Sequence, residues 1–412
     1  MTRPSLERQL GTADAVVVGL GAMLGAGVFA ALAPAAAAAG SLLLVGLAVA
    51  AVVAACNALS SAQLAAVHPS SGGTYVYGRR QLGPFWGHLA GFGFIVGKTA
   101  SCAAMALTVG AYAAPELARP LAVTVVVALT AVNLRGIAKT ARLTRLLVAL
   151  VLLALAVVVV AALAGGTVST EGLRATRGAG AYDVLQSAGL LFFAFAGYAR
   201  IATLGEEVRD PARTIPRAIP LALGLVLAVY AAVAVSALLA VGPVALAASA
   251  APLVTVVTGG ELSALGPIVR VGGAVAALGV LLSLLVGVSR TALAMAREGD
   301  LPQWLAAVHP VHRVPHHAEL AVAGLVVTLV LVVDLRGAIG FSSFAVLVYY
   351  AVANASALTL QPPQRRYPRA VAGLGLAGCL LLAATLPLAS VLTGLAVLVL
   401  GSAAYGVQSR RA

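Results

Sequence analysis

The chain has 412 residues, of which 61% are hydrophobic and only 9% are charged. A soluble domain usually carries about 25% charged residues, so this composition excludes an ordinary soluble enzyme, and it equally excludes a disordered chain. The net charge of +13 comes from basic residues that lie between apolar runs, which favours a membrane protein over a nucleic-acid-binding protein.

Apolar runs recur along the whole chain, and each is long enough to cross a bilayer, which takes about 20 residues. The first run is too long for the apolar region of a signal peptide, so we interpret it as an uncleaved first span. The sequence therefore predicts an all-α integral membrane protein with about 12 transmembrane helices and no separate soluble domain. The expected spans are 14–36, 41–66, 85–112, 119–134, 143–164, 181–204, 217–241, 267–293, 318–334, 339–359, 370–386 and 388–407.

The basic residues support this number of spans. Most of the 26 Lys and Arg residues fall in segments that share one side of the membrane when the spans alternate in direction. The positive-inside rule places that side in the cytoplasm. We therefore expect a multi-pass protein of the cytoplasmic (inner) membrane whose N- and C-termini both face the cytoplasm.

The first span contains four glycines within nine residues, Gly19 to Gly27, which makes a poor helix. One interpretation is close helix packing through the G-x-x-x-G pair of Gly21 and Gly25. The other is a helix break at Gly25, Ala26 and Gly27, whose freed N–H groups would hold an anionic group such as a carboxylate. The glycines alone leave both interpretations open.

The third span carries Lys98 near the middle of the membrane. No Asp or Glu lies at a comparable depth, and an ionisable residue inside a membrane is functional by default. Lys98 is therefore a candidate for coupling transport to protons or for contacting the substrate. The alternative is that its aliphatic chain extends along the helix so that the ammonium group reaches water. Cys102 lies one turn later on the same helix face.

The sixth span contains a glycine among aromatic residues, in the run Phe193, Ala194, Phe195, Ala196, Gly197 and Tyr198. Folds built from two inverted five-helix repeats place their broken helices first in each half, which corresponds to the first and sixth spans. Unwound carbonyl groups at such a break could bind an ammonium group. Two facing breaks would then suit both ends of an amino acid.

The eighth span offers one hydroxyl that we expect to face the first helix, that of Ser283. A single hydroxyl is a poor basis for a sodium site, so we rank sodium coupling below proton coupling or exchange. The cysteines, Cys56, Cys102 and Cys379, lack the spacing of a metal site, and no phosphate-binding loop occurs. The sequence thus predicts no cofactor and no resident metal.

Four motifs, in order along the chain, resemble those of the amino acid–polyamine–organocation permeases. They are Gly21–Phe29, Pro69–Tyr77, Phe193–Ile219 and Ser289–Pro302. The resemblance implies a LeuT-type fold in a single transmembrane domain, with inverted repeats at about 14–164 and 181–359 and two extra helices at about 370–407. It also implies a non-enzymatic secondary transporter that works by alternating access.

The resemblance further implies where a substrate would bind. The backbone of Gly25, Ala26 and Gly27 would take the carboxylate, carbonyls near Phe195 and Ala196 would take the amino group, and Phe193 or Phe195 would shield the site. The expected pocket is completed by four further residues, Lys98, Cys102, Gly197 and Tyr198.

The sequence departs from some relatives in ways that bear on the substrate. An acidic residue that some arginine and polyamine exchangers carry is replaced by Ala199, followed by Arg200. Arg200 is therefore a second coupling candidate, although it could instead reach the cytoplasmic surface. We expect a neutral or acidic amino acid rather than a cationic one; the alternatives are a polyamine or organic amine exchanger, a channel and an intramembrane enzyme.

Overall fold

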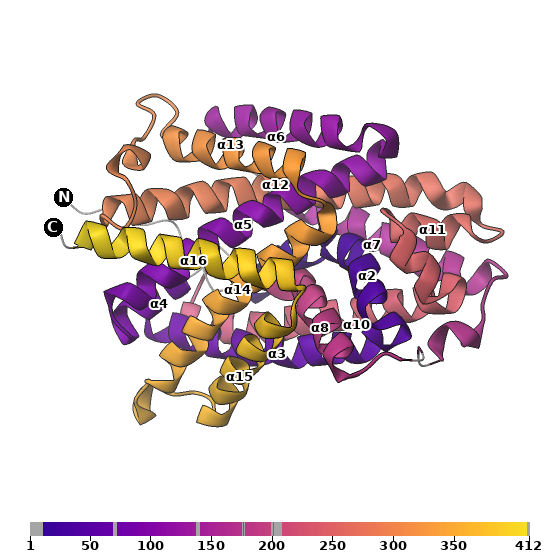
Figure 1. Ribbon diagram of the computed structural model, residues 1–412, viewed down its shortest axis with the longest axis horizontal. Coiled ribbons are helices and arrows are strands. Elements are labelled where there is room, and N and C mark those ends of the chain that lie inside the picture. The colour runs from indigo at the N-terminus through magenta and orange to yellow at the C-terminus, as the bar shows by residue number, and fades with distance from the viewer. Residues whose placement is uncertain are drawn as a thin grey trace.

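The computed structural model describes residues 11–68, 72–136, 141–174, 176, 178–198, 201 and 208–409, and these are almost entirely helical (Figure 1). The fold class is therefore all-α, as predicted. The main helices are α1 (Thr12–Met23), α2 (Ala26–Ala39), α3 (Leu43–Val67), α4 (Thr74–Gln81), α5 (Pro84–Ala113), α6 (Ala118–Leu134), α7 (Ala141–Ala164), α8 (Ala181–Phe195), α10 (Pro211–Ala248), α11 (Pro252–Thr258), α12 (Gly266–Arg297), α13 (His316–Val332), α14 (Leu335–Leu358), α15 (Arg369–Thr385) and α16 (Leu388–Ser409).

Within the described residues, eight helical stretches are long and apolar enough to cross a membrane. They are Gly27–Val67, Pro84–Ala113, Pro115–Leu134, Leu143–Ala164, Arg213–Ala248, Ser263–Arg297, Leu335–Leu358 and Leu388–Val407. Three further apolar helices, α1, α13 and α15, are shorter. The chain is thus a multi-pass helical protein, and the total of twelve spans stays a prediction.

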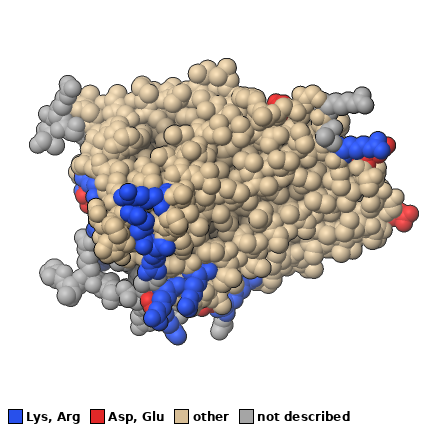
Figure 2. All heavy atoms as spheres, turned by 90° about the horizontal axis from the view of Figure 1, so that it is seen from below, with Lys and Arg blue, Asp and Glu red and all other residues tan. Residues whose placement is uncertain are grey.

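The charged side chains lie mainly towards the two ends of the molecule, as expected for a membrane protein. Figure 2 shows a wide band without charged side chains, with Lys and Arg gathered towards one end of the molecule and acidic groups at both ends. The short helices α4 and α11 lie at opposite ends of the long axis (Figure 1). The uncharged band between them is the part of this face that lipid tails would contact.

The predicted boundaries agree closely with the helices. The span expected at 85–112 is α5 (Pro84–Ala113), and the two last spans are separated at Leu386 and Pro387, as expected. The span expected at 217–241 ends where Gly242 takes a positive φ of 72° inside α10, which interrupts that helix. The long interruption expected at 242–266 is partly ordered, since it contains α11.

The core of the bundle is formed around α5 and α14. Most of each helix is buried, whereas only a minor part of α6 and of α16 is buried. Small residues make this close contact possible: a β-carbon added to Gly97 of α5 would lie 2.8 Å from the β-carbon of Ala345 of α14. The two helices also share a buried hydrogen bond of 2.6 Å between the hydroxyls of Ser101 and Ser342.

A buried polar cluster connects α15 to this core. The side-chain amide of Asn354 in α14 donates to the side-chain oxygen of Asn57 in α3 at 2.6 Å, and the thiol of Cys379 in α15 donates to the same oxygen at 3.3 Å. All three residues are fully buried. The peripheral helix α15 is therefore attached to the centre of the bundle by polar contacts as well as by apolar packing.

Candidate substrate-binding site

The first apolar run is interrupted in its middle. Helix α1 ends at Met23, and the N–H of Leu24 caps it by donating to the carbonyl of Leu20 at 2.7 Å. Gly25 has extended backbone dihedrals and α2 begins at Ala26. A β-carbon on Gly25 would lie 2.0 Å from the side chain of Val280 in α12, so this position has no room for a side chain.

This break decides between the two interpretations of the glycine-rich run. Gly21 faces the side chains of Val148 and Thr144 in α7, whereas Gly25 faces α12. The two glycines therefore do not form one G-x-x-x-G packing surface, and that interpretation was wrong because the helix does not continue between them. Both glycines still permit close packing, each against a different helix.

The second interruption follows α8. This helix ends at Phe195, and Ala196 to Tyr198 form one turn of 3-10 helix, η4. Arg200 lies outside the described residues. The α-helical part of the sixth apolar run therefore ends at Phe195, and Gly197 lies in the 3-10 turn that follows.

The two interruptions pack directly against each other. A β-carbon added to Gly27 would lie 2.6 Å from the α-carbon of Ala194, and one added to Gly197 would lie 2.3 Å from the carbonyl oxygen of Ala22. The start of α2 thus contacts the end of α8, while η4 contacts the end of α1. Four helix ends meet at one place, deep in the protein.

Helix ends leave backbone groups without intrahelical partners: N–H groups at the start of α2 and carbonyl groups at the ends of α1 and α8. Three buried tyrosines donate to carbonyls in this region. Tyr230 of α10 contacts the carbonyls of both Met23, at 2.5 Å, and Ala194, at 3.0 Å. Tyr350 of α14 donates to Ala196, and Tyr112 of α5 donates to Phe29.

We did not predict these tyrosines from the sequence. A buried Tyr hydroxyl usually finds a hydrogen-bond partner, and this rule marks any Tyr inside an apolar run as a residue that must reach a polar group. The rule does not say which group is reached, because the contacts join residues far apart in the chain. Tyr198 is also buried, stacked on Tyr350 with ring centres 5.0 Å apart.

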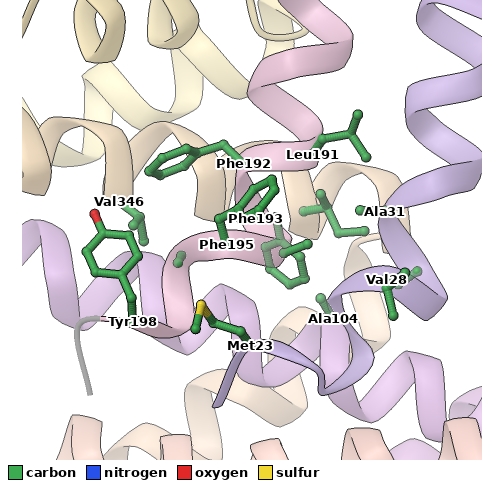
Figure 3. Close-up of a cluster of buried hydrophobic side chains, with 14 of the residues drawn as sticks. Met23, Val28, Ala31, Ala104, Leu191, Phe192, Phe193, Phe195, Tyr198 and Val346 are labelled. Carbon is green, nitrogen blue, oxygen red and sulfur yellow. The ribbon is translucent and has the colours of Figure 1, made fainter. Parts of the chain in front are cut away.

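The side chains around the break are apolar. Figure 3 shows Met23, Phe193, Phe195 and Tyr198 gathered where α1 and α8 end. Phe195 is fully buried and meets the ring of Tyr230 edge-on, with ring centres 5.2 Å apart. The surroundings of the freed peptide groups therefore contain aromatic and aliphatic groups.

Lys98 is buried in α5 with 8% of its surface exposed, and Cys102 one turn later is fully buried. Lys98, Met105 and Tyr112 follow at seven-residue spacing along one side of α5. The hydroxyl of Tyr112 reaches the carbonyl of Phe29 in α2, so this side of α5 lies against α2 at the C-terminal end of α5. Within the described part of the chain, no carboxylate forms an ion pair with Lys98.

Ser283 lies on the same side of α12 as Ala276 and Val280, the two residues next to Gly25. It is exposed, and its hydroxyl donates to the carbonyl of Gly279 in its own helix at 3.0 Å. This hydroxyl therefore bonds within its own helix, and its direction towards the first helix stays a prediction.

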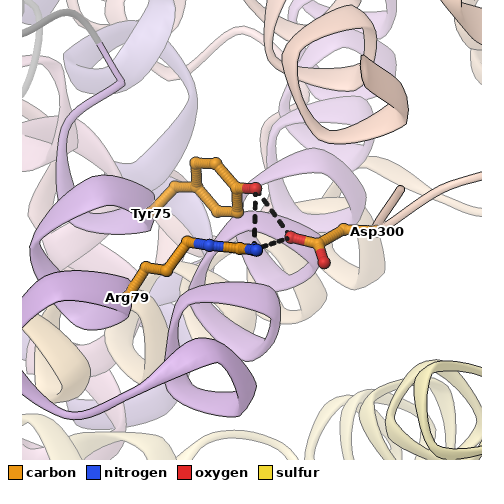
Figure 4. A network of polar contacts seen from close by, with 3 residues as sticks. All are labelled: Tyr75, Arg79 and Asp300. Atoms are coloured by element: carbon orange, nitrogen blue, oxygen red, sulfur yellow. Dashed lines mark hydrogen bonds and ion pairs between the residues drawn. The ribbon is translucent and has the colours of Figure 1, made fainter. Parts of the chain in front are cut away.

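A charged network lies outside the apolar band, where α4 meets the loop after α12 (Figure 4). Asp300 accepts hydrogen bonds from the hydroxyl of Tyr75 at 2.6 Å and from the guanidinium of Arg79 at 2.8 Å. Burial and Asp300 together raise the pKa of the Tyr75 hydroxyl above its ordinary value. The network therefore joins two of the motifs that carry the family resemblance.

Comparison with known proteins places the sequence among amino acid permeases. The sequence profile of the family described as "Amino acid permease" matches residues 10–405. An uncharacterized transporter of Mycobacterium tuberculosis is 64% identical over 403 residues, covering 98% of this chain and 92% of that protein. The branched-chain amino acid permease BcaP of Bacillus subtilis is 27% identical over 445 residues, covering 99% of this chain and 94% of BcaP. The human cationic amino acid transporter 4 is 29% identical over 387 residues, covering 87% of this chain and 60% of that protein.

Proposed function

Because the chain belongs to the amino acid permease family, we propose that it is a secondary transporter that carries an amino acid across the cytoplasmic membrane by alternating access. The observation that carries this proposal is the contact between two helix interruptions, Gly27 against Ala194 and Gly197 against Ala22. It brings the N–H end of one helix and the carbonyl ends of two others to one buried place, where peptide groups lack partners within their own helices. A zwitterion needs both polarities within the length of one amino acid.

The two polar ends of the substrate are proposed to bind the two kinds of helix end. The N–H groups at the start of α2, over Gly25, Ala26 and Gly27, would hold the carboxylate, because a helix N-terminus favours a negative charge. Carbonyls at the end of α8 and in η4, around Phe195 and Ala196, would hold the ammonium group. Phe193 or Phe195 would then shield the bound molecule.

We propose that the substrate is neutral or acidic rather than cationic. The buried side chains beside the break, Met23, Phe193 and Phe195, offer an apolar surface to the substrate side chain. Lys98 is proposed to face the first interruption, where it would add a positive charge or a hydrogen-bond donor. A cationic side chain there would lose its hydration without gaining a carboxylate partner.

Transport is proposed to be coupled to protons or to proceed by exchange. Lys98 is the first candidate for the proton-carrying group, with Arg200 and Ser283 as further candidates. Support comes from the burial of Lys98 within α5. The proposed topology has twelve spans, inverted repeats at about 14–164 and 181–359, two extra helices at about 370–407, and both termini in the cytoplasm.

Counterflow in proteoliposomes tests this function. The purified protein is reconstituted with unlabelled L-leucine inside, and the uptake of labelled L-leucine is followed without any ion gradient. A carrier shows transient accumulation of label above equilibrium, whereas a channel or an enzyme does not. Competition by neutral or acidic amino acids supports the substrate class, and competition by arginine or putrescine alone would support the cationic or polyamine alternative.

A further inference from the structure

A groove of about 340 Å³ lies where the end of α5 meets the start of α12. It is lined by one side of α12 and by the last two residues of α5, mainly by Arg270, Val271, Ala274, Val275, Tyr112 and Ala113. All of these side chains except that of Arg270 are uncharged, and most are apolar. The groove therefore combines an apolar wall with one cation.

The groove opens towards the lipid bilayer. Val271 is 63% exposed and its neighbour Ile268 is 43% exposed, in a helix long and apolar enough to cross a membrane. Large apolar side chains exposed on such a helix contact lipid. A β-carbon on Gly273 would lie 2.4 Å from the ring of Tyr112, so α5 and α12 are in close contact beside the groove. The small side chain of Ala274 leaves the hollow next to this contact.

The length of α12 places Arg270 at the level of the lipid headgroups. The helix has 32 residues and is therefore about 48 Å long, whereas the hydrocarbon core of a bilayer is about 30 Å thick. If the helix is centred, each end extends about 9 Å beyond this core. Arg270 follows the first residue, Gly266, by four positions, which is about 6 Å along the axis. Val271, Ala274 and Val275 continue from there towards the membrane centre.

Arg270 has no anionic partner within the described residues. Its guanidinium makes one hydrogen bond there, a long one of 3.5 Å to the carbonyl of Tyr112, although a guanidinium carries five N–H donors. No carboxylate of the described chain forms an ion pair with it. Glu116, which follows α5, and Glu261, which precedes α12, are both exposed.

We propose that this groove binds one anionic phospholipid, whose phosphate pairs with Arg270 while an acyl chain lies along Val271, Ala274 and Val275. A guanidinium suits a phosphate because two parallel N–H groups can donate to it. A small soluble anion would leave the apolar wall uncovered, whereas a phospholipid supplies the charge and covers the wall. A zwitterionic headgroup would bring an ammonium group for which the groove offers no carboxylate. This inference goes beyond the proposed function and does not depend on it.

Arg270→Gln tests the charged contact. The purified full-length protein is delipidated in detergent and titrated with phosphatidylglycerol, and the bound lipid is counted by native mass spectrometry. We expect the affinity for the first bound lipid to fall about tenfold, because a charge-assisted hydrogen bond is lost. Arg119→Gln is the matched control, since Arg119 lies exposed at the start of α6 and donates to the carbonyl of Leu331. Equal affinity of the unchanged protein and Arg270→Gln overturns the proposal.

Val271→Trp tests the apolar wall. The indole ring fills the groove while Arg270 is kept, and the exposed position tolerates a larger side chain. We expect phosphatidylglycerol to bind about fivefold more weakly, because the acyl chain loses its place against α12. Ile268→Trp is the control, because Ile268 is also exposed but does not line the groove. Equal binding by the two variants shows that no acyl chain lies in the groove and overturns the proposal.

Thermal unfolding separates the sources of the anion. Phosphatidylglycerol should raise the melting temperature of the unchanged protein by about 3 °C, because a ligand that binds only the folded state stabilises it. Phosphatidylethanolamine and sodium phosphate should each raise it by less than about 1 °C. An equal rise with sodium phosphate would identify a site for soluble anions, and an equal rise with phosphatidylethanolamine would remove the selectivity for an anionic lipid. Either result overturns the proposal, and neither measurement uses an amino acid, so the test is independent of the transport assignment.

Discussion

Gly27 and Ala194 touch backbone to backbone: a β-carbon on Gly27 would lie 2.6 Å from the α-carbon of Ala194 and 2.9 Å from its β-carbon. No side-chain movement can relieve an overlap with an α-carbon. The start of α2 and the end of α8 are therefore held at a separation that only glycine allows.

The first prediction follows from this contact. Gly27→Ala should reduce L-leucine counterflow at least tenfold, because the methyl group must separate the two helix ends, and overpacking of this kind costs about 1–3 kcal/mol. The control is Gly224→Ala in α10, where nothing lies within 4 Å of the added β-carbon. Equal activity of the two variants would contradict the importance of the contact.

The second prediction concerns Lys98. Lys98→Met should abolish uptake driven by a proton gradient while leaving counterflow measurable, because only the former requires a group that gains and loses a proton. Arg119→Met serves as the control, since Arg119 is exposed at the start of α6 and bonds to the carbonyl of Leu331. Normal pH-dependent accumulation by Lys98→Met would remove this residue from the coupling mechanism.

The third prediction concerns the network around Asp300. Its side chain is 4% exposed and that of Arg79 is 32% exposed, so Asp300→Asn leaves a partly buried cation without its partner. We expect a loss of about 2 kcal/mol in stability, below the value for a fully buried pair because water reaches Arg79.

Thermal unfolding in detergent measures this loss. Asp210→Asn, which breaks an exposed pair with Arg213, is the matched control and should change stability by less than about 0.5 kcal/mol. An Arg79→Gln/Asp300→Asn double variant should lose less than the two single variants together. Strict additivity would show that the two groups do not interact in solution.

The fourth prediction concerns pH. Burial, reinforced by the nearby Arg80, lowers the pKa of His68 below its ordinary value of 6.5. As the pH falls through 6.5, the unfolded chain takes up a proton at this residue that the folded protein does not, so stability falls towards acidic pH and is unaffected well above 6.5.

His68→Gln should remove this contribution. The comparison is the change in melting temperature between pH 7.5 and pH 5.5 in the unchanged protein and in the variant. The variant should lose less stability on acidification. A parallel loss in both proteins would assign the pH dependence to other groups.

Much of the fold could be predicted from the sequence, because a span is a local property of composition and length. The boundaries of α5 were predicted in this way, whereas the glycines near Gly25 left the interruption as one of two interpretations. The partners of the interruptions could not be predicted: Tyr230 lies 207 positions from Met23, and nothing in its own apolar run marks the carbonyl that it reaches.

The same limit applies to the charged network. Tyr75, Arg79 and Asp300 lie in or beside segments that we recognised as motifs, but their pairing depends on how α4 lies against the end of α12. The contact of Tyr112 in α5 with Phe29 in α2 is of the same kind, since the two residues lie 83 positions apart. Long-range contacts of this kind can be identified only from the three-dimensional structure.

The attachment of Cys379 to Asn57 and Asn354 has a consequence for dissection of the chain. A shortened protein that stops after α14 would leave two fully buried amide side chains facing lipid tails, which offer no hydrogen bonds. Helix α15 therefore cannot be treated as a removable appendage, and a minimal version of this protein must retain it.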